Sequence, residues 1–187
     1  MARIYLVRHG KAKGEWATER DPGLDPVGRE QAKAAARSLA PLGPLKIVSS
    51  PYARTRETSM PLAEIWNVTP TVDERIGEIP SPVEDLADRL RWFQKVMALR
   101  WLDVDANLKA WRRGVIEALH ECEEDTVLFS HAIAINVVVG EATGDDRVVC
   151  FWPENSSITT VDATQSVLRV IHRGVEDAHK DWKNIKV

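Results

Sequence analysis

Short apolar runs alternate with longer amphipathic stretches along most of the chain. The run at residues 3–7 and the run at residues 126–129 are too short for helices and are typical of strands buried on both faces. Similar short runs predict further strands at residues 45–49 and 69–73, and a closing pair at residues 157–162 and 167–172.

Helix-capping signals lie between these runs. Asp25 followed by Pro26 is an N-cap with proline at the first helical position, and it opens an alanine-rich stretch that ends at prolines and a glycine. Ser50-Pro51 repeats the signal. The helices predicted from capping and periodicity cover residues 27–40, 50–66, 83–100 and 105–122.

Alternating strands and helices are typical of an α/β fold in which helices cover both faces of a sheet. We therefore expect a three-layer sandwich with a largely parallel central sheet. No glycine-serine linker or change of composition divides the sequence, so a single domain over residues 1–187 is expected.

The composition narrows the possible functions. Hydrophobic residues make up 44% of the 187 residues, and the net charge of −3 has no long run of one sign, which argues against a nucleic-acid partner. Two widely spaced cysteines suggest neither a disulfide framework nor a zinc site. The N-terminal apolar run is too short for a signal peptide or a membrane span, so a cytoplasmic protein without a membrane partner is expected. The oligomeric state stays open.

Candidate chemistry follows three of the predicted strands. Arg8 and His9 come after the first strand, Arg54 lies just beyond the second, and His131 follows the strand at residues 126–129. Ligands of open α/β sheets bind at the carboxyl ends of the strands, so these side chains are expected to meet at one edge.

Two arginines and two histidines suit the binding of a phosphoryl group. Guanidinium groups pair with phosphoryl oxygens and stay charged, and imidazole serves as nucleophile or donor. A helix starting at Ser50 would add backbone N–H groups, and Gly10 would allow a close backbone approach or a positive φ. The pattern predicts an anion clamp with a nucleophile inside it.

These residues match a known pattern. Arg8-His9-Gly10, the segment 49–58 (Ser-Ser-Pro-Tyr-Ala-Arg-Thr-Arg-Glu-Thr) and Phe129-Ser130-His131 resemble, in order and spacing, the signature motifs of the histidine phosphatase superfamily. The resemblance covers nearly the whole chain and implies the phosphoglycerate-mutase-like fold in its compact phosphatase branch.

The resemblance also implies roles for individual residues. His9 would be the nucleophile that forms a phosphohistidine, and Arg8, Arg54 and His131 would hold the phosphoryl oxygens. Glu78 would protonate the leaving group, with Glu74 as the second candidate. The chemistry would need no metal and no organic cofactor, because the arginines supply the positive charge.

Four functions remain open at this stage. They are a small-molecule phosphomonoesterase, a protein phosphohistidine phosphatase, a phosphoglycerate mutase and a non-catalytic phosphate-binding module, so the partner is a phosphorylated small molecule or phosphoprotein. The segment Lys11-Ala12-Lys13 lacks the serine and asparagine of the mutases, which makes the mutase the least favoured, and a binding module has no need of His9.

Substrate specificity is expected to depend on residues 11–24 and 76–101. Lys11, Lys13, Trp16, Trp92 and Trp101 are predicted to form the rim of the site. Arg56 is expected to lie on an exposed helix face, and Asn155-Ser156-Ser157 is expected either near the site or in a plain turn.

Overall fold

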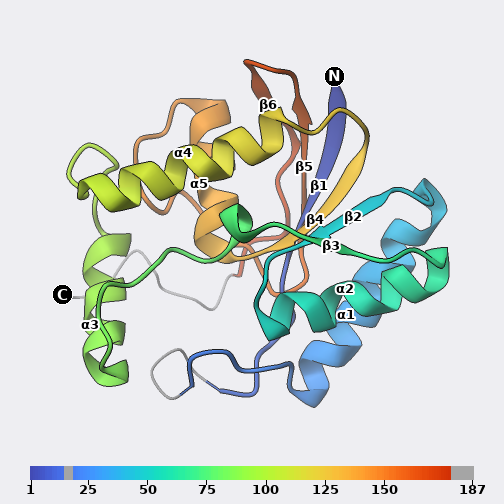
Figure 1. Ribbon diagram of the computed structural model, residues 1–187, viewed down its shortest axis with the longest axis horizontal. Helices are drawn as coiled ribbons and strands as arrows, with labels where there is room; N and C mark the ends of the chain where they lie inside the picture. Colours follow the sequence, from blue (N-terminus) through green and yellow to red (C-terminus); the bar gives the residue numbers. More distant parts are fainter. Residues whose placement is uncertain (15–18, 178–187) are drawn as a thin grey trace.

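The structure is a computed structural model that describes residues 1–14 and 19–177. A central sheet runs through the molecule in the order β3-β2-β4-β1-β5-β6 (Figure 1). Its strands, as found in the described residues, are β1 (Ala2–Arg8), β2 (Lys46–Ser49), β3 (Thr71–Val72), β4 (Thr126–Ser130), β5 (Ile158–Ala163) and β6 (Leu168–His172).

The sheet is parallel on one side and antiparallel on the other. Strands β1 to β4 pair in parallel, with β4 between β1 and β2. Strand β5 runs antiparallel to β1, and β6 continues as a hairpin from β5. The closing pair therefore makes the sheet mixed, and the carboxyl ends of β1, β2 and β4 lie together at one edge, as the sequence predicted.

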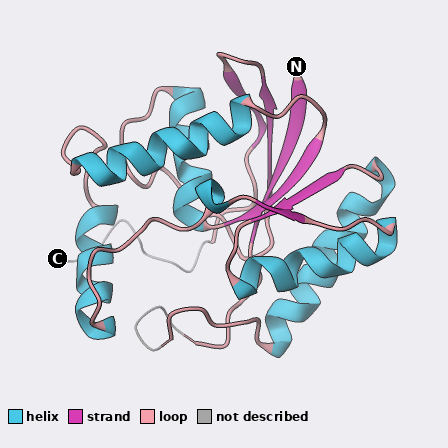
Figure 2. Ribbon diagram, in the orientation of Figure 1, coloured by secondary structure: helices cyan, strands magenta, loops and turns pink. Residues whose placement is uncertain are grey.

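Helices cover both faces of the sheet, which confirms the expected three-layer α/β architecture (Figures 1 and 2). Helices α1 (Pro26–Leu39) and α2 (Ala53–Trp66) pack on one face, and α4 (Ala106–His120) and α5 (Ala132–Thr143) pack on the other. The structure also contains α3 (Leu86–Met97) and the short 3-10 helices η1 (Ala40–Leu42) and η2 (Glu74–Ile76).

Strands β1 and β4 contribute side chains to two hydrophobic cores, one on each face of the sheet. Ile4 and Leu6 of β1 pack with the residues of α4 and α5, whereas Val7 packs on the opposite face with α1 and α2. Strand β4 does the same with Leu128 on one face and Phe129 on the other. Because both faces are buried, these strands have continuous apolar runs instead of alternation.

Two helix starts differ in how well the sequence predicted them. Asp25 caps α1 as expected, since its Oδ1 accepts a hydrogen bond from the Gly28 N–H at 2.7 Å. The predicted start at Ser50 is wrong, because α2 begins at Ala53. Pro51 and Tyr52 form a turn instead, which frees the Ser50 hydroxyl for a contact in the site described below. The exposed Asp21 carboxylate accepts from the Ala53 N–H at 2.8 Å.

Two other helices also depart from expectation. The helix predicted at residues 83–100 is shorter, and the apolar stretch after His131, which had no assignment, forms α5. Residues of α5 from Ala132 to Gly140 are all buried, so this helix has no polar face that would reveal its period. No helix in the described ranges is both long and apolar enough to span a membrane.

Candidate active site

A cavity of about 500 Å³ opens at the carboxyl edge of the parallel strands. Four of the predicted site residues, Arg8, His9, Arg54 and Glu78, line it together. The ring of His131 lies beside it, with its centroid 5.2 Å from that of His9. Residues far apart in the sequence therefore meet where the topology places the strand ends.

Backbone hydrogen bonds hold His9 in place directly after β1. Its N–H donates to the Ser130 carbonyl at 3.0 Å, and Asn155 Nδ2 donates to its carbonyl at the same distance. His9 Nδ1 lies 2.7 Å from the Gly10 carbonyl oxygen, which only accepts hydrogen bonds. The proton of the neutral ring is therefore on Nδ1, and Nε2 carries the lone pair that a nucleophile requires.

Gly10 is required for a close backbone approach and not for a positive φ. A Cβ at Gly10 would lie 2.5 Å from the Gly28 carbonyl oxygen, and a Cβ at Gly28 would lie 2.1 Å from that of Lys11. The two glycines let the start of α1 pack directly on the segment after His9. The Gly10 N–H donates to Thr58 of α2 at 3.0 Å, which fixes the segment from a second side.

Arg8 is buried beneath the loop between α5 and β5. Its Nη1 donates to the Pro153 carbonyl at 2.6 Å, and its guanidinium lies 5.3 Å from the centroid of the Trp152 ring. Burial lowers the pKa of Arg8 to about 10, with Glu78 acting in the opposite direction. The guanidinium keeps its charge at neutral pH, although burial removes the water that would stabilise this charge.

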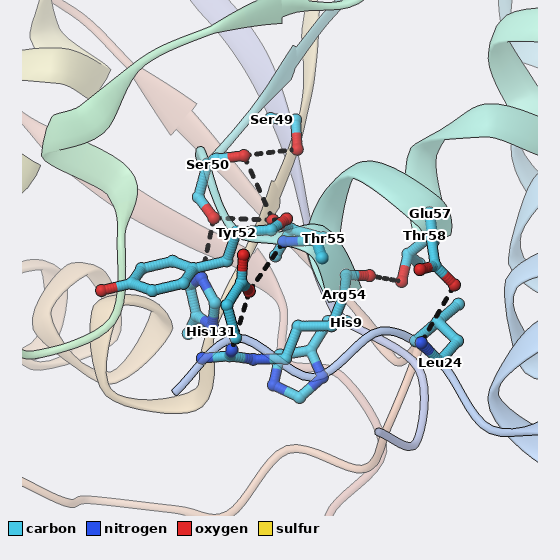
Figure 3. Close-up of polar contacts among 12 residues, drawn as sticks. His9, Leu24, Ser49, Ser50, Tyr52, Arg54, Thr55, Glu57, Thr58 and His131 are labelled. Atoms are coloured by element: carbon cyan, nitrogen blue, oxygen red, sulfur yellow. Dashed lines mark hydrogen bonds and ion pairs between the residues drawn. The ribbon is translucent and has the colours of Figure 1, made fainter. Parts of the chain in front are cut away.

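Arg54 enters the cavity from the first turn of α2 (Figure 3). Its guanidinium lies 4.7 Å from the centroid of the Tyr52 ring, and Asp21 Oδ1 lies 3.7 Å from its Nη1. Burial lowers the pKa of Arg54 as well. Arg56, two residues on, is exposed, as expected for the outer face of the helix.

His131 is fully buried at the end of β4. Its Nε2 lies 2.7 Å from the Ser50 hydroxyl, and the Tyr52 ring meets it edge-on at 5.1 Å. Burial, followed by the charges of Arg54, His9 and Arg8, lowers the pKa of His131 well below its usual value. The ring is therefore neutral in the resting site.

Glu78 lines the cavity, and Glu74 lies exposed on η2. The Glu78 carboxylate accepts from the Ile79 N–H at 3.0 Å. Burial raises its pKa, although this hydrogen bond and the positive charges of Arg54 and Arg8 oppose the shift. A raised pKa is what a proton donor at neutral pH needs.

Contacts with β4 and with the end of α4 fix the position of the Glu78 loop. The hydroxyl of Ser130, at the end of β4, donates to the Ile76 carbonyl at 2.7 Å. Arg75 binds both Asp73 and Glu121 at 2.8 Å, which ties η2 to the end of α4. The Ser-His motif thus also holds the loop that carries the acid.

The predicted rim is largely wrong. Trp101 is 3% exposed and packs in the core with α4 and α5, and Trp92 packs against the same core, because both side chains are needed to bury that face. Of the two lysines, Lys11 lines the cavity and Lys13 is not among the described residues that do. Trp16 lies outside the described residues.

The observed outer wall is mainly apolar. Lys11, the cation of this wall, lies 3.1 Å from Asp25 Oδ2. The described residues that line the cavity beyond the four predicted ones are Lys11, Ala12, Gly14, Pro22, Leu90, Phe93, Ala132, Trp152 and Asn155. The sequence analysis missed Leu90, Phe93 and Trp152, since nothing in their spacing separates them from core residues. Asn155 was expected either near the site or in a plain turn, and it lies at the site.

Two further residues were missed although a signal was present. Ser50 and Thr55 lie at the start of α2 in the same motif as Arg54, and both contact the His131 side of the site. Because Ser50 was interpreted as a helix cap, its contact with His131 was not predicted. Within the described ranges, no group of three or more His, Cys, Asp or Glu side chains is arranged to hold a metal ion.

Comparisons with known proteins identify relatives that are similar in sequence. A 90-residue stretch is 39% identical to the PE-PGRS family protein PE_PGRS11 of Mycobacterium tuberculosis, covering 44% of this chain and 15% of that protein. The probable phosphoglycerate mutase GpmB of Citrobacter koseri is 35% identical over 194 residues, covering 89% of this chain and 87% of its own.

A solved structure shares the fold. The mycobacterial glucosyl-3-phosphoglycerate phosphatase Rv2419c, in complex with VO3, superposes with a TM-score of 0.69 at 21% identity, over 94% of this chain and all of that one. The model of the histidine phosphatase superfamily (branch 1) matches residues 4–175. The chain therefore belongs to the histidine phosphatase superfamily.

Proposed function

We propose that this protein is a metal-independent phosphatase that hydrolyses small phosphomonoesters through a phosphohistidine on His9. The observation that carries the proposal is the pairing of a fixed nucleophile with two buried cations. His9 Nδ1 donates to Gly10, so Nε2 carries the lone pair that attacks phosphorus, and Arg8 and Arg54 line the same cavity.

The two arginines provide the binding energy for an anion. Arg8 is 7% exposed and Arg54 is 3% exposed. Arg8 Nε and Arg54 Nη1 are buried atoms with no hydrogen-bond partner in the described part of the chain. Buried donors of this kind stabilise charge that develops on a transferring phosphoryl group, because they are already oriented and desolvated.

The first step transfers the phosphoryl group to the protein. His9 Nε2 attacks phosphorus, a P–N bond forms, and the P–O bond to the leaving group breaks. Glu78, whose raised pKa favours the protonated form, gives its proton to the leaving oxygen. The phosphorylated ring keeps its Nδ1 proton, whose hydrogen bond to Gly10 stabilises the positive ring.

The second step releases inorganic phosphate. The Glu78 carboxylate takes a proton from water, the water oxygen attacks phosphorus, and the P–N bond breaks. His9 returns to its neutral state and Glu78 regains its proton, so the cycle closes without any other reactant.

The shape of the cavity favours a small molecule over a phosphoprotein. A volume of about 500 Å³ lies within the range of small-molecule sites. Leu90, Phe93 and Trp152 line it beyond the phosphate-binding residues, and this apolar wall suits a leaving group with an apolar part. A phosphohistidine on a protein surface would leave most of this wall unused.

Turnover of p-nitrophenyl phosphate in the presence of a chelator tests the proposal. Wild type is expected to release p-nitrophenol, His9→Ala to lose at least about 10⁴-fold in kcat/KM, and exposed Arg56→Ala to stay within about twofold. Activity that persists in His9→Ala would exclude the phosphohistidine route.

A substrate panel separates the remaining functions. Small phosphomonoesters are expected to be hydrolysed with release of inorganic phosphate, and phosphohistidine peptides are expected to be poor substrates. Interconversion of 2- and 3-phosphoglycerate without release of phosphate would instead establish mutase activity. Binding of phosphate without any turnover would establish a binding module.

A further inference from the structure

A chain of hydroxyl groups from Thr55 through Ser50 ends on His131 (Figure 3). The chain begins at Thr55, whose Oγ1 lies 2.8 Å from the Tyr52 carbonyl oxygen and 3.2 Å from the Ser50 carbonyl oxygen. Carbonyl oxygens only accept hydrogen bonds, so the single Thr55 hydroxyl proton points toward them.

The position of the Thr55 proton determines which atoms donate in the next two contacts of the chain. Ser50 Oγ lies 2.7 Å from Thr55 Oγ1, a contact in which either hydroxyl can donate. With the Thr55 proton assigned to the carbonyl oxygens, Ser50 is the donor here. Ser50 Oγ also lies 2.7 Å from His131 Nε2, and with its own proton used it accepts there. His131 therefore carries a proton on Nε2, and the neutral ring has a lone pair on Nδ1.

His131 Nδ1 is buried and has no hydrogen-bond partner among the described residues. The groups around the ring oppose a second proton in the resting state, since burial and the charges of Arg54, His9 and Arg8 all lower the pKa of His131. The ionisable groups near it are Arg8 and His9 at the end of β1, Tyr52 and Arg54 at the start of α2, and Glu78 across the cavity after η2.

We propose that Ser50 and Thr55 are positioning residues that fix His131 as a hydrogen-bond acceptor, so that the site takes the phosphoryl group together with one proton. That proton arrives with the phosphate monoanion, or from water when the dianion binds, and ends on His131 Nδ1. The resulting imidazolium donates from Nε2 to Ser50 and from Nδ1 to a phosphoryl oxygen. The inference rests on the proposed phosphate site but not on turnover.

The tautomer is read directly by NMR on wild type with ¹⁵N-labelled histidine. At about pH 7, two-bond ¹H–¹⁵N correlations are expected to show His131 as the neutral Nε2–H tautomer, and saturating inorganic phosphate is expected to convert it to the imidazolium. The signal is assigned by its loss in His131→Gln. A doubly protonated ring without phosphate, an Nδ1–H tautomer, or a ring that stays neutral with phosphate would overturn the proposal.

Calorimetry measures how many protons the protein takes up when phosphate binds. Binding of inorganic phosphate at about pH 8, in two buffers of different ionisation enthalpy, is expected to take up about one proton per site, because phosphate is then mainly the dianion. Glu78 is the competing acceptor, so the measurement is repeated with Glu78→Gln. Uptake that persists in this variant supports His131, and uptake that is absent in wild type or lost in Glu78→Gln contradicts the proposal.

Two neighbouring serines provide a matched pair of variants. Ser50→Ala removes the acceptor for Nε2–H, and it is expected to weaken phosphate binding by about tenfold and to populate the Nδ1–H tautomer. Ser49→Ala removes a buried hydroxyl that donates to the Ser50 carbonyl and leaves the chain to His131 intact, so phosphate affinity is expected to stay within about twofold. An unchanged tautomer in folded Ser50→Ala would show that Ser50 does not position the ring.

These experiments separate the two proposals. Phosphate binding and the tautomer require no phosphoenzyme, so they can hold even if His9 proves not to be the nucleophile. Conversely, a phosphohistidine on His9 together with a resting imidazolium at His131 would support the proposed function and contradict this inference.

Discussion

The two halves of the cavity differ in how they are built. The proposed phosphate half consists of Arg8 and Arg54 with His131 beside them, and all three are almost completely buried and held by hydrogen bonds and ring contacts. The leaving-group half consists of apolar side chains, among which Leu90 of α3 is 37% exposed. The first half comes from the ends of β1 and β4 and the first turn of α2, and the other is formed by side chains of a peripheral helix and loops.

This difference separates chemistry from specificity. Arg8 at the end of β1 and Arg54 in the first turn of α2 are both buried, so the charges proposed to act on phosphorus are preorganised. The Leu90 side chain is 37% exposed and lies outside the core that packs on the strands, so it can change with little consequence for them. We therefore expect substitutions in the phosphate half to affect all substrates alike, and substitutions in the leaving-group half to affect substrates differently.

The largest effect is expected from Arg54→Ala. Loss of a buried guanidinium from the phosphate half should lower kcat/KM by about 10³-fold for every phosphomonoester, since the charge on the phosphoryl group loses a preorganised donor. Steady-state kinetics on substrates with different leaving groups measure this, with exposed Arg56→Ala as the control. A loss that depends strongly on the leaving group would contradict the division into two halves.

Glu78→Gln is expected to have the next largest effect, and its size should depend on the leaving group. An alkyl phosphate should lose about 10²- to 10³-fold in kcat/KM because its leaving oxygen needs a proton. With p-nitrophenyl phosphate the first step should survive, and rapid mixing should reveal a burst of phenol as the phosphoenzyme accumulates. Equal losses for both substrates would contradict the role of Glu78 as acid.

The pH dependence of Glu78 follows from the direction of its pKa shift. Burial raises the pKa, so the proton that the first step needs is retained at higher pH than on an exposed glutamate and is lost as the pH rises through the raised value. The free energy of unfolding also falls as the pH rises from the ordinary pKa of a glutamate to the raised value, because the unfolded chain releases this proton at lower pH than the folded protein does. Chemical denaturation across this pH range should show a fall in stability that Glu78→Gln removes.

The smallest effect is expected from Leu90→Ala. Removing part of the apolar wall should lower kcat/KM by about tenfold for aryl phosphates and by less than twofold for phosphates of small polar alcohols. Inhibition by inorganic phosphate, which occupies only the phosphate half, should not change. Leu102→Ala is a suitable control because Leu102 is 76% exposed and does not line the cavity. A parallel loss for all substrates would show that Leu90 supports the phosphate half.

The sequence was sufficient to predict that Arg8, His9 and Arg54 meet at one edge of the sheet, with His131 beside them. Each of Arg8, His9 and His131 follows an apolar run that is recognisable as a buried strand, and the rule that ligands bind at the carboxyl ends of parallel strands brings them together. Glu78 was predicted only through the resemblance to a family, since a glutamate in a short loop carries no signal of its own.

The leaving-group half could not be predicted in the same way. Trp101 and Leu90 are both large apolar residues near α3, and only packing decides that Trp101 enters the core and Leu90 reaches the cavity. The hydroxyl chain from Thr55 through Ser50 depends on where α2 begins, and a shift of two residues, from Pro51 to Ala53, is below what capping signals resolve. Contacts between side chains set these features, and local sequence does not.

Trapping of the phosphoenzyme tests the central claim most directly. Wild type is mixed with ³²P-labelled substrate, quenched within milliseconds and digested, and the label is located on a peptide. We predict an acid-labile, base-stable phosphoryl group on the peptide that contains His9, and no label in His9→Ala. Substrate turnover without any labelled intermediate, or label on another residue, would contradict the account.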